Sequence, residues 1–388
     1  MGRRLLGLIV ALGLVIGVLV LVQQQHRPPK PGPQSSATAG TIALTGLIGS
    51  EKSDFFTSDQ VRQALRAKGL AVSVRTSGSW QMADEARAEP PGAALGPASG
   101  PPPGSAYDFV IPASSVAAKA IGTPITTTPV RPFYSPLVVV THQQTAQFLK
   151  GVGLASPDAD GVWTFHMAQY LTDVQQHLGW GDLKGATPPP DLAGKIYIAT
   201  TDPNTSSSAS LYLAVMSYLA NGDQVVSDQS GIDRTASLLR YLMANQGALL
   251  ASSDQLFRDF VAGTGKPLSW TYESEVAEQA MKGKLPGDMV VLYPDIGITS
   301  DHTVVELTPK ADALAQALLN DPALISLEAQ YGFRPTADPQ AMVAALKAKG
   351  HAQGFLAGLT SLGSQPPPPT TDILQKIVAA ASPAGGGN

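Results

Sequence analysis

The sequence predicts an α/β protein with largely parallel sheets, because short apolar strands alternate with helical segments along the chain. A strand at Thr41–Thr45 precedes a Gly-Ser loop, a helix from Ser58 to Lys68 and a second strand at Ala71–Arg75. Strands at Asp108–Ile111 and Lys195–Thr200 are each followed by a hydroxyl-rich loop and a helical pattern. The same order of strand, loop and helix therefore recurs.

The composition fits a folded body and excludes several classes of protein. With 388 residues, of which 44% are hydrophobic, the chain can build a sizeable core, and two domains or one bilobed body are expected. The net charge is −4, and no basic run exceeds Arg3-Arg4, so a nucleic-acid-binding protein is not expected. The chain has no cysteine, which excludes disulfides, thiolate metal ligands, a cysteine nucleophile and a lipid-modified cysteine anchor.

The N-terminus carries a candidate membrane anchor. Arg3 and Arg4 precede Leu5–Val22, an uncharged apolar stretch of about 18 residues, close to the minimum that spans a bilayer. A signal peptide is the alternative, but no small-residue cleavage site follows directly, and the nearest is at Ala37–Ala39. We expect residues 1–22 to be an uncleaved transmembrane helix of a single-pass cell-membrane protein, with the body on the extracytoplasmic side.

Pro-rich polar stretches divide the rest of the chain. Residues 23–40 are typical of an extended tether, and residues 85–106 are typical of a disordered surface insertion. Residues 364–388 form a Pro/Gly-rich C-terminal tail with a short amphipathic segment at Asp372–Ala381. Between these breaks, two apolar segments about 150 residues apart are predicted to pair as a crossover between two lobes. They are Leu137–Thr141 and Met289–Tyr293.

Several segments, taken in order, resemble the type II periplasmic-binding-protein fold of extracellular solute-binding proteins, particularly the branch with molybdate and sulfate receptors. The resemblance covers about residues 41–336. Its cues are LTGLIGSEKS at 44–53, YDFVIPASS at 107–115, SPLVVV at 135–140, ATTDPNTSSS at 199–208, VVLYPD at 290–295, Asp321-Pro and YGFRP at 331–335.

This resemblance implies two lobes that close on a ligand by bending at hinge strands. Lobe 1 is expected to comprise residues 41–136 plus 295–363, and lobe 2 residues 137–294. The chain departs from the family in lacking a lipid-modified cysteine and in carrying the 85–106 insertion. The resemblance therefore supports ligand binding more directly than it supports coupling to a transporter.

Hydroxyl side chains follow three predicted strands at the point where a helix begins, which is where open α/β sheets bind ligands. In a dry cleft, hydroxyl and amide donors bind small oxyanions well. The alternative is that these residues are ordinary helix caps. The predicted ligand-binding residues are Ser50, Glu51, Lys52, Ser77, Ser114, Ser115, Thr201, Asp202, Ser206, Ser207, Glu273 and Tyr293.

Three of these residues have a competing interpretation. Lys52 adds a charge to an anion site or is a surface loop lysine. Glu273, in a segment where Tyr272 and Ser274 could also line the cleft, is a ligand contact or a first-turn acid that complements a helix dipole. Tyr293 is a hinge or cleft residue, or a packed core tyrosine.

Enzyme signatures are missing from the sequence. It has no Gly-x-Ser-x-Gly elbow, phosphate-binding Gly-Lys loop or His-Glu-x-x-His motif, and its six histidines lack metal-ligand spacing. We therefore expect no catalytic residue, metal or cofactor.

The sequence predicts an extracytoplasmic, membrane-anchored solute-binding protein that captures a small polar or anionic ligand between two lobes. Its expected partners are that solute and an ABC-transporter permease or another membrane protein, with no nucleic acid. One alternative is an interaction or signalling protein of the same fold with an empty or vestigial cleft. Another is a secreted hydrolase with unrecognised catalytic groups.

The mature protein is expected to keep its N-terminal helix, because no cleavage site adjoins the apolar run. Intact-mass spectrometry of the protein purified from membranes should give a mass that includes residues 1–22. A mature terminus near Gly40 would contradict the anchor and leave export standing.

Overall fold

A computed structural model describes residues 40–87, 107–122 and 129–382. The predicted anchor, nearly all of the tether, residues 88–106 of the insertion and the Gly-rich end lie outside the described residues. Within the described ranges, no helix combines the length and the apolarity that crossing a bilayer requires. Residues from Ile42 onward cluster as one compact unit.

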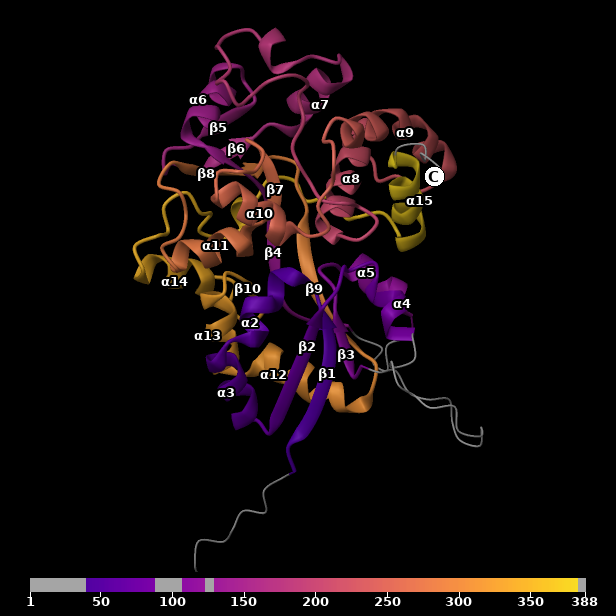
Figure 1. The fold of residues 1–388 in the computed structure, drawn as a ribbon, viewed down its shortest axis with the longest axis vertical. Coiled ribbons are helices and arrows are strands. Elements are labelled where there is room, and N and C mark those ends of the chain that lie inside the picture. The colour runs from indigo at the N-terminus through magenta and orange to yellow at the C-terminus, as the bar shows by residue number, and fades with distance from the viewer. Residues whose placement is uncertain (1–39, 88–106, 123–128, 383–388) are drawn as a thin grey trace, which may run out of the picture. The chain divides into compact units, whose positions relative to one another are not determined.

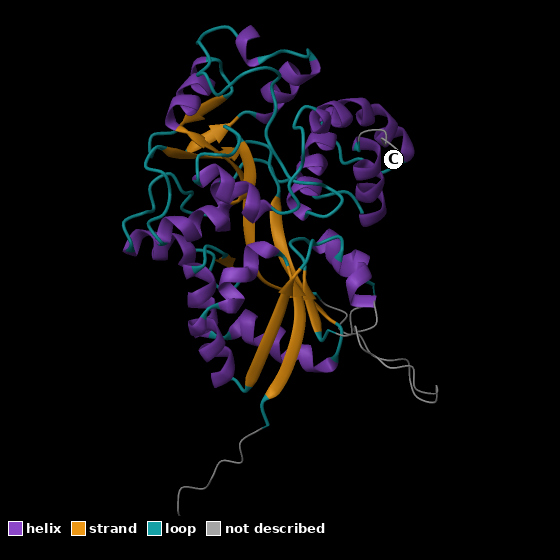
Figure 2. Ribbon diagram, viewed as in Figure 1, coloured by secondary structure: helices purple, strands orange, loops and turns teal. Residues whose placement is uncertain are grey.

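Three parallel strands open the fold. β1 (Ile42–Ile48) lies between β2 (Leu70–Thr76) and β3 (Phe109–Ile111). Helices flank these strands on both sides (Figure 2), and the first of them confirm the predicted strand-helix-strand unit. They are η1 (Ser50–Lys52), α2 (Ser53–Thr57), α3 (Asp59–Ala67), α4 (Met82–Arg87) and α5 (Ser115–Ile121). The insertion predicted from residue 85 therefore begins later, because α4 continues to Arg87 and Ala86 is buried.

One long strand, β4 (Val130–His142), joins the two ends of the sheet (Figure 1). Its first half pairs with β9 (Thr299–Glu306), and its second half pairs with β8 (Met289–Pro294). The predicted pairing of the two apolar segments is confirmed, since Val139 lies opposite Leu292. β4 also pairs with β7 (Ser269–Tyr272) and β10 (Arg334–Pro335).

The sheet is mixed rather than largely parallel. It continues from β8 to β6 (Trp163–Phe165) and β5 (Ala155–Pro157), and among the described strands three pairings are parallel and six antiparallel. The expectation was wrong because β8 and β9 return beside β4 in the opposite direction.

The remaining described helices are α6 (Gln143–Gly151), α7 (Met167–Gln175), η2 (Trp180–Asp182), α8 (Ser207–Ala220), α9 (Gln229–Ala244), α10 (Ser253–Val261), α11 (Glu273–Met281), η3 (Pro309–Ala311), α12 (Asp312–Asn320), α13 (Pro322–Gln330), α14 (Ala341–Ala348), η4 (Leu359–Ser361) and α15 (Thr371–Ala381).

Residues 195–200 do not form the predicted strand. This segment makes only isolated bridges, from Lys195 to Gly179 and from Ala199 to Ser269. The alternating apolar pattern arises because Ile196 and Ile198 are buried in the core, without a neighbouring strand in register. Burial alone therefore produced the strand-like pattern.

The C-terminal amphipathic segment is a helix, as its pattern indicates. Helix α15 buries Leu374 and Ile377 in the core that α8 and α9 also line. The hydroxyl of Thr371, at its first residue, donates a hydrogen bond to the carbonyl of Val116 in α5, 2.9 Å away. The end of the chain is therefore part of the core.

A buried charge network lies where β10, α11 and β8 meet. Arg334 and Glu273 are fully buried, and the guanidinium Nε and Nη2 donate to the carboxylate at 2.6 and 2.7 Å. The hydroxyl of Tyr293 donates to the same carboxylate at 2.5 Å. Burial is the main cause of the raised pKa of Tyr293, and the neighbouring charge of Glu273 adds to it, so the phenol stays protonated as the donor. These contacts link β8, α11 and β10 beside β4.

Replacing Arg334 with Met should lower the free energy of unfolding by about 3–5 kcal/mol, because Glu273 would remain buried without its counter-charge. Tyr293→Phe, which removes the hydrogen bond to Glu273 and the one accepted from the N–H of Leu356, should cost about 1–3 kcal/mol. Urea denaturation measures both. The double variant Glu273→Gln/Arg334→Met serves as the control and should be more stable than Arg334→Met alone. A cost below about 1 kcal/mol for Arg334→Met would show that the buried ion pair of Arg334 with Glu273 does not stabilise the fold.

Candidate functional site

The candidate site is a cavity of about 270 Å³ lined mainly by hydroxyl side chains. Its walls come from four loops, those after β1 and β2 and those that lead into α8 and α10, together with Tyr272 at the end of β7. The lining residues are Gly49, Ser50, Glu51, Thr76, Ser77, Gly78, Ser79, Gln81, Ser206, Ser207, Ala251, Ser252, Ser253 and Tyr272. Among them, Glu51 carries the only formal charge.

Strand register explains why the first two loops meet. β1 and β2 run parallel with Ile48 opposite Thr76, so the residues that follow both strands emerge at the same edge of the sheet. Ser50 and Ser77 lie just beyond that edge and line the cavity. On the other side, α8 and α10 begin at the cavity wall, and the first turn of a helix leaves backbone N–H groups without intrahelical partners.

Three hydroxyl groups at the cavity wall are available to a ligand. Ser50, Thr76 and Ser252 line the cavity, and among the described residues their hydroxyls make no hydrogen bond. Ser252 occupies the N-cap position of α10 without capping it through its side chain. A polar ligand would therefore gain hydrogen bonds here without displacing protein contacts.

The predicted hydroxyl loop at residues 113–115 reaches the cavity through one contact. The hydroxyls of Ser114 and Ser207 are 3.1 Å apart, and Ser207 lines the cavity. Ser114 also accepts a hydrogen bond from the backbone N–H of Ala117, so it is a true helix cap. Ser206 also lines the cavity but makes no side-chain cap bond. The structure thus brings Ser50, Ser206 and Ser207 together, with Ser114 directly behind them.

A tryptophan joins the two sides of the cavity. The indole N–H of Trp80, in the loop after β2, donates to the hydroxyl of Ser210 at 3.0 Å. The backbone N–H of Trp80 donates to the carbonyl of Thr205 at 3.3 Å. Gly78 lies so close that an added Cβ would be 2.7 Å from that carbonyl oxygen. The loop after β2 is therefore packed tightly onto the approach to α8.

Some predicted residues lie elsewhere. The hydroxyl of Thr201 is buried against that of Ser208 at 2.9 Å, and Asp202 caps its own turn by accepting from the backbone N–H of Asn204 at 2.9 Å. Neither residue lines the cavity. Ser115 does not line it either, and its backbone N–H donates to Asp301 at 2.7 Å. These positions have local structural roles.

Lys52 is a buried residue, not the surface lysine that the sequence suggests. Its side chain is fully inaccessible and forms an ion pair with Glu51, and its Nζ lies 3.1 Å from Nδ1 of His302. Burial lowers the pKa of Lys52, and burial with the nearby lysine lowers that of His302 well below its usual value. The helical turn at residues 50–52 directs Lys52 inward while Glu51 faces the cavity.

Glu273 and Tyr293 are not cavity residues either. Both belong to the buried network with Arg334, outside the hydroxyl-lined cavity, and the burial of Tyr293 agrees with the packed-tyrosine alternative. The cavity is lined by Tyr272, which the sequence placed in a possible cleft-lining segment, and by Ser252 and Ser253, which the sequence analysis did not identify. The Ser252-Ser253 pair at the start of a helix is the signal that could have identified this fourth loop.

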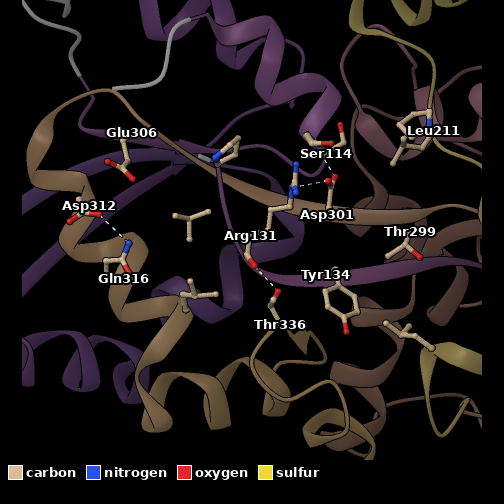
Figure 3. A pocket seen from close by; sticks show the side chains of 16 residues that line it. Ser114, Arg131, Tyr134, Leu211, Thr299, Asp301, Glu306, Asp312, Gln316 and Thr336 are labelled. Carbon is tan, nitrogen blue, oxygen red and sulfur yellow. Dashed lines mark hydrogen bonds and ion pairs between the residues drawn. The ribbon is translucent and has the colours of Figure 1, made fainter. Parts of the chain in front are cut away.

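A larger cavity of about 1080 Å³ lies beside α5 and β9 (Figure 3). Ser114, Tyr134 and the ion pair of Arg131 with Asp301, 3.1 Å between Nε and Oδ2, are among its lining residues. Its rim includes Pro129, the first residue after the undescribed stretch 123–128. Because it joins only two predicted site residues, both from one loop, we do not assign it as the site.

A buried carboxyl adjoins the hydroxyl-lined cavity. Glu275 accepts a hydrogen bond from Ser253 at 2.8 Å and another from Thr271. Burial, with added repulsion from Asp254 and Glu51, raises its pKa to about 8. Glu275 is therefore mostly protonated at neutral pH.

Comparison with known proteins identifies the fold. No family model matches the sequence, and no curated protein matches it. Similar solved structures include a periplasmic thiamin binding protein, with 13% identity, a TM-score of 0.55, and coverage of 88% of this chain and 97% of that one.

Two further structures are similar at 11% identity and a TM-score of 0.52. AfuA from Actinobacillus pleuropneumoniae, a periplasmic binding protein with fructose-6-phosphate bound, matches over 87% of this chain and 94% of its own. Iron-bound HitA from Pseudomonas aeruginosa matches over 88% and 99%. The chain thus has the type II periplasmic-binding-protein fold.

The contribution of Glu275 to the stability of the protein should fall between about pH 5 and pH 8. The unfolded Glu275 carboxyl releases its proton near pH 4.5, whereas the folded one keeps it to about pH 8. In this window the unfolded state binds fewer protons, so each pH unit costs about 1.4 kcal/mol. Glu275→Gln should reduce the loss between pH 5.5 and 7.5 by about 2–3 kcal/mol in urea denaturation, and the exposed Asp59→Asn should not change it. Equal losses in parent and Glu275→Gln would show that Glu275 ionises normally.

Proposed function

We propose that the protein is an extracytoplasmic solute-binding protein that captures a small polar or anionic ligand in the hydroxyl-lined cavity. The observation that carries this proposal is the convergence of four loops on one cavity, where the hydroxyls of Ser50, Thr76 and Ser252 have no partner among the described residues. Binding sites combine a concave shape with a few convergent polar groups, and this cavity has both.

The arrangement of strands supports capture by two lobes. Lobe 1 comprises residues 41–136 plus 295–363, and lobe 2 comprises residues 137–294. β4 passes from one to the other, and the cavity is lined from both, by Ser50 and Ser77 on one side and by Ser206 and Ser252 on the other. Bending at β4 and at the junction of β8 with β9 would open and close the cavity.

The remaining parts of the proposal concern the setting of the protein. The apolar residues 5–22 support a single-pass anchor in the cell membrane with the body outside. An ABC-type permease or another membrane protein is the proposed partner, and oxyanions of the molybdate and sulfate type belong to the proposed ligand class. The mechanism is capture and closure without a chemical step.

Ligand binding can be tested by thermal denaturation against a library of anions, sugars, amino acids and amines. A ligand of the native state raises stability by RT ln(1 + [L]/Kd), about 2.7 kcal/mol at a hundredfold excess over Kd. Ser252→Ala should then weaken binding by about 0.5–1.5 kcal/mol without lowering stability, since Ser252 makes no cap bond. Ser114→Ala should instead cost about 1 kcal/mol of stability, as a helix cap does.

Ser326→Ala, on the exposed face of α13, is the matched control and should leave both quantities unchanged. If no compound in the library stabilises the protein, the interaction or signalling alternative gains over solute capture. A ligand whose affinity is unaffected by Ser252→Ala and by Ser50→Ala would place binding elsewhere.

A further inference from the structure

A second cavity adjoins the hydroxyl-lined one and has a different chemical character. Its volume is about 240 Å³, and it shares Ser50, Glu51 and Thr76 with the first cavity. Together with the cationic Arg258, five side chains with carboxyl groups line it: Glu51, Asp54, Asp254, Glu275 and Glu278. A ligand in the first cavity therefore lies next to a compartment rich in carboxyl groups.

Three of these carboxyl groups accept hydrogen bonds from neighbouring side chains of the protein. Lys282 donates to Asp54 at 2.7 Å and to Glu278 at 2.8 Å. Glu275 accepts hydrogen bonds from Ser253 and from Thr271. These groups maintain the shape of the compartment and need no ligand.

The other two carboxylates each keep one oxygen without a partner among the described residues. Oε1 of Glu51 binds Lys52, whereas Oε2 makes no hydrogen bond to them, and the side chain is only 5% exposed. Oδ2 of Asp254 binds Arg258 at 2.8 Å, whereas Oδ1 is buried without a partner. Both side chains line the second cavity. Oδ1 of Asp254 is a buried acceptor without a donor, which is costly, so the free protein bears a cost at this atom that a ligand donor can remove.

We propose that the second cavity binds a protonated amine, so that the captured solute carries an ammonium group next to its hydroxyl- or oxo-bearing part. This inference rests on the proposed solute-binding function and narrows its ligand class. An ammonium offers three donors and a positive charge, which suits Oε2 of Glu51 and Oδ1 of Asp254. No three His, Asp or Glu side chains in the described ranges are arranged to hold a metal ion, which favours an ammonium over a metal cation.

The two joined cavities also indicate the kind of molecule. The hydroxyl-lined part, at about 270 Å³, takes a polar head, and the carboxylate-lined part, at about 240 Å³, takes an amine. Amino sugars and amino alcohols present both groups within a few bonds. A fully ionised oxyanion such as sulfate lacks a donor, so it would meet Glu51 with repulsion.

Matched ligand pairs test the proposal by isothermal titration calorimetry at pH 7. Glucosamine is compared with glucose, and ethanolamine with ethylene glycol, while sulfate and molybdate represent ionised oxyanions. We expect the amine of at least one pair to bind tenfold or more tightly than its neutral counterpart, with both oxyanions weaker. Equal affinities within each pair, or tighter binding of an oxyanion, would overturn the proposal.

Two variants assign the effect to the cavity. Glu51→Gln and Asp254→Asn should each weaken binding of the amine tenfold or more and change binding of the neutral counterpart less than threefold. Asp59→Asn, a carboxylate 91% exposed on α3, is the charge-matched control and should change neither. Because Glu51→Gln removes the partner of buried Lys52 and could impair folding, Asp254→Asn decides the outcome if that variant does not fold. Unchanged amine affinity in a folded Asp254→Asn protein would overturn the proposal.

The same measurements separate this inference from the proposed function. Binding of neutral or anionic ligands that weakens in Ser252→Ala, with no preference for the amines, would overturn the ammonium site and leave solute capture standing. If no compound binds, either in the thermal-denaturation library or among the matched ligand pairs, both the ammonium site and the proposed solute-binding function are contradicted.

Discussion

The described fold depends on the continuity of one strand. β4 hydrogen-bonds to β9 over its first half and to β8 over its second, and β7 and β10 also attach to it. The strands on either side of it are short or form their pairs locally, so both halves of the sheet are positioned through β4. The buried carboxylate of Glu273 and the guanidinium of Arg334 hold this junction from the side. A rotation of one half against the other must therefore be absorbed within β4 and at the turn between β8 and β9.

Local patterns predicted what depends on local forces. The strand, helix and strand at the start of the body follow from alternating apolar residues and from the cap at Ser58, whose hydroxyl accepts from the N–H of Val61. The hydroxyl loops after β1 and before α8 were likewise visible, because a loop that ends a strand and starts a helix has a recognisable composition. The parallel register of β1 and β2 explains why the loops after these two strands meet at the cavity.

Long-range partners account for what the sequence could not show. The partner of Glu273 is 61 residues away, and the contact of Lys52 with His302 spans 250 residues, so neither burial has a local signature. The direction of β8 and β9 relative to β4 depends on the path of the intervening residues 143–288. The periodicity of apolar residues within a strand carries no information about that direction. Residues 195–200 illustrate the opposite error, since buried alternating residues resembled a strand although the segment makes only isolated bridges, one of them from Ala199 to Ser269 of β7.

The site combines neutral donors with carboxylates and buries its one adjacent lysine. Lys52 balances one oxygen of Glu51 from behind the cavity wall and does not line the cavity, so hydroxyl groups and the first turns of α8 and α10 supply the hydrogen-bond donors at the wall. Such a wall favours ligands that both accept and donate hydrogen bonds. Trp80 links the loop after β2 to α8, so the wall is continuous from one side to the other.

The position of α15 has a consequence for the burial of the core. Leu374 and Ile377 complete the same core as Phe165 and Tyr212, residues that lie far before them in the chain. That core is complete only when residues 371–381 are in place, so a chain without them keeps an unfinished apolar surface. Residues far apart in the chain therefore depend on one another for burial, and loss of α15 would expose the apolar faces of α8 and α9 to water.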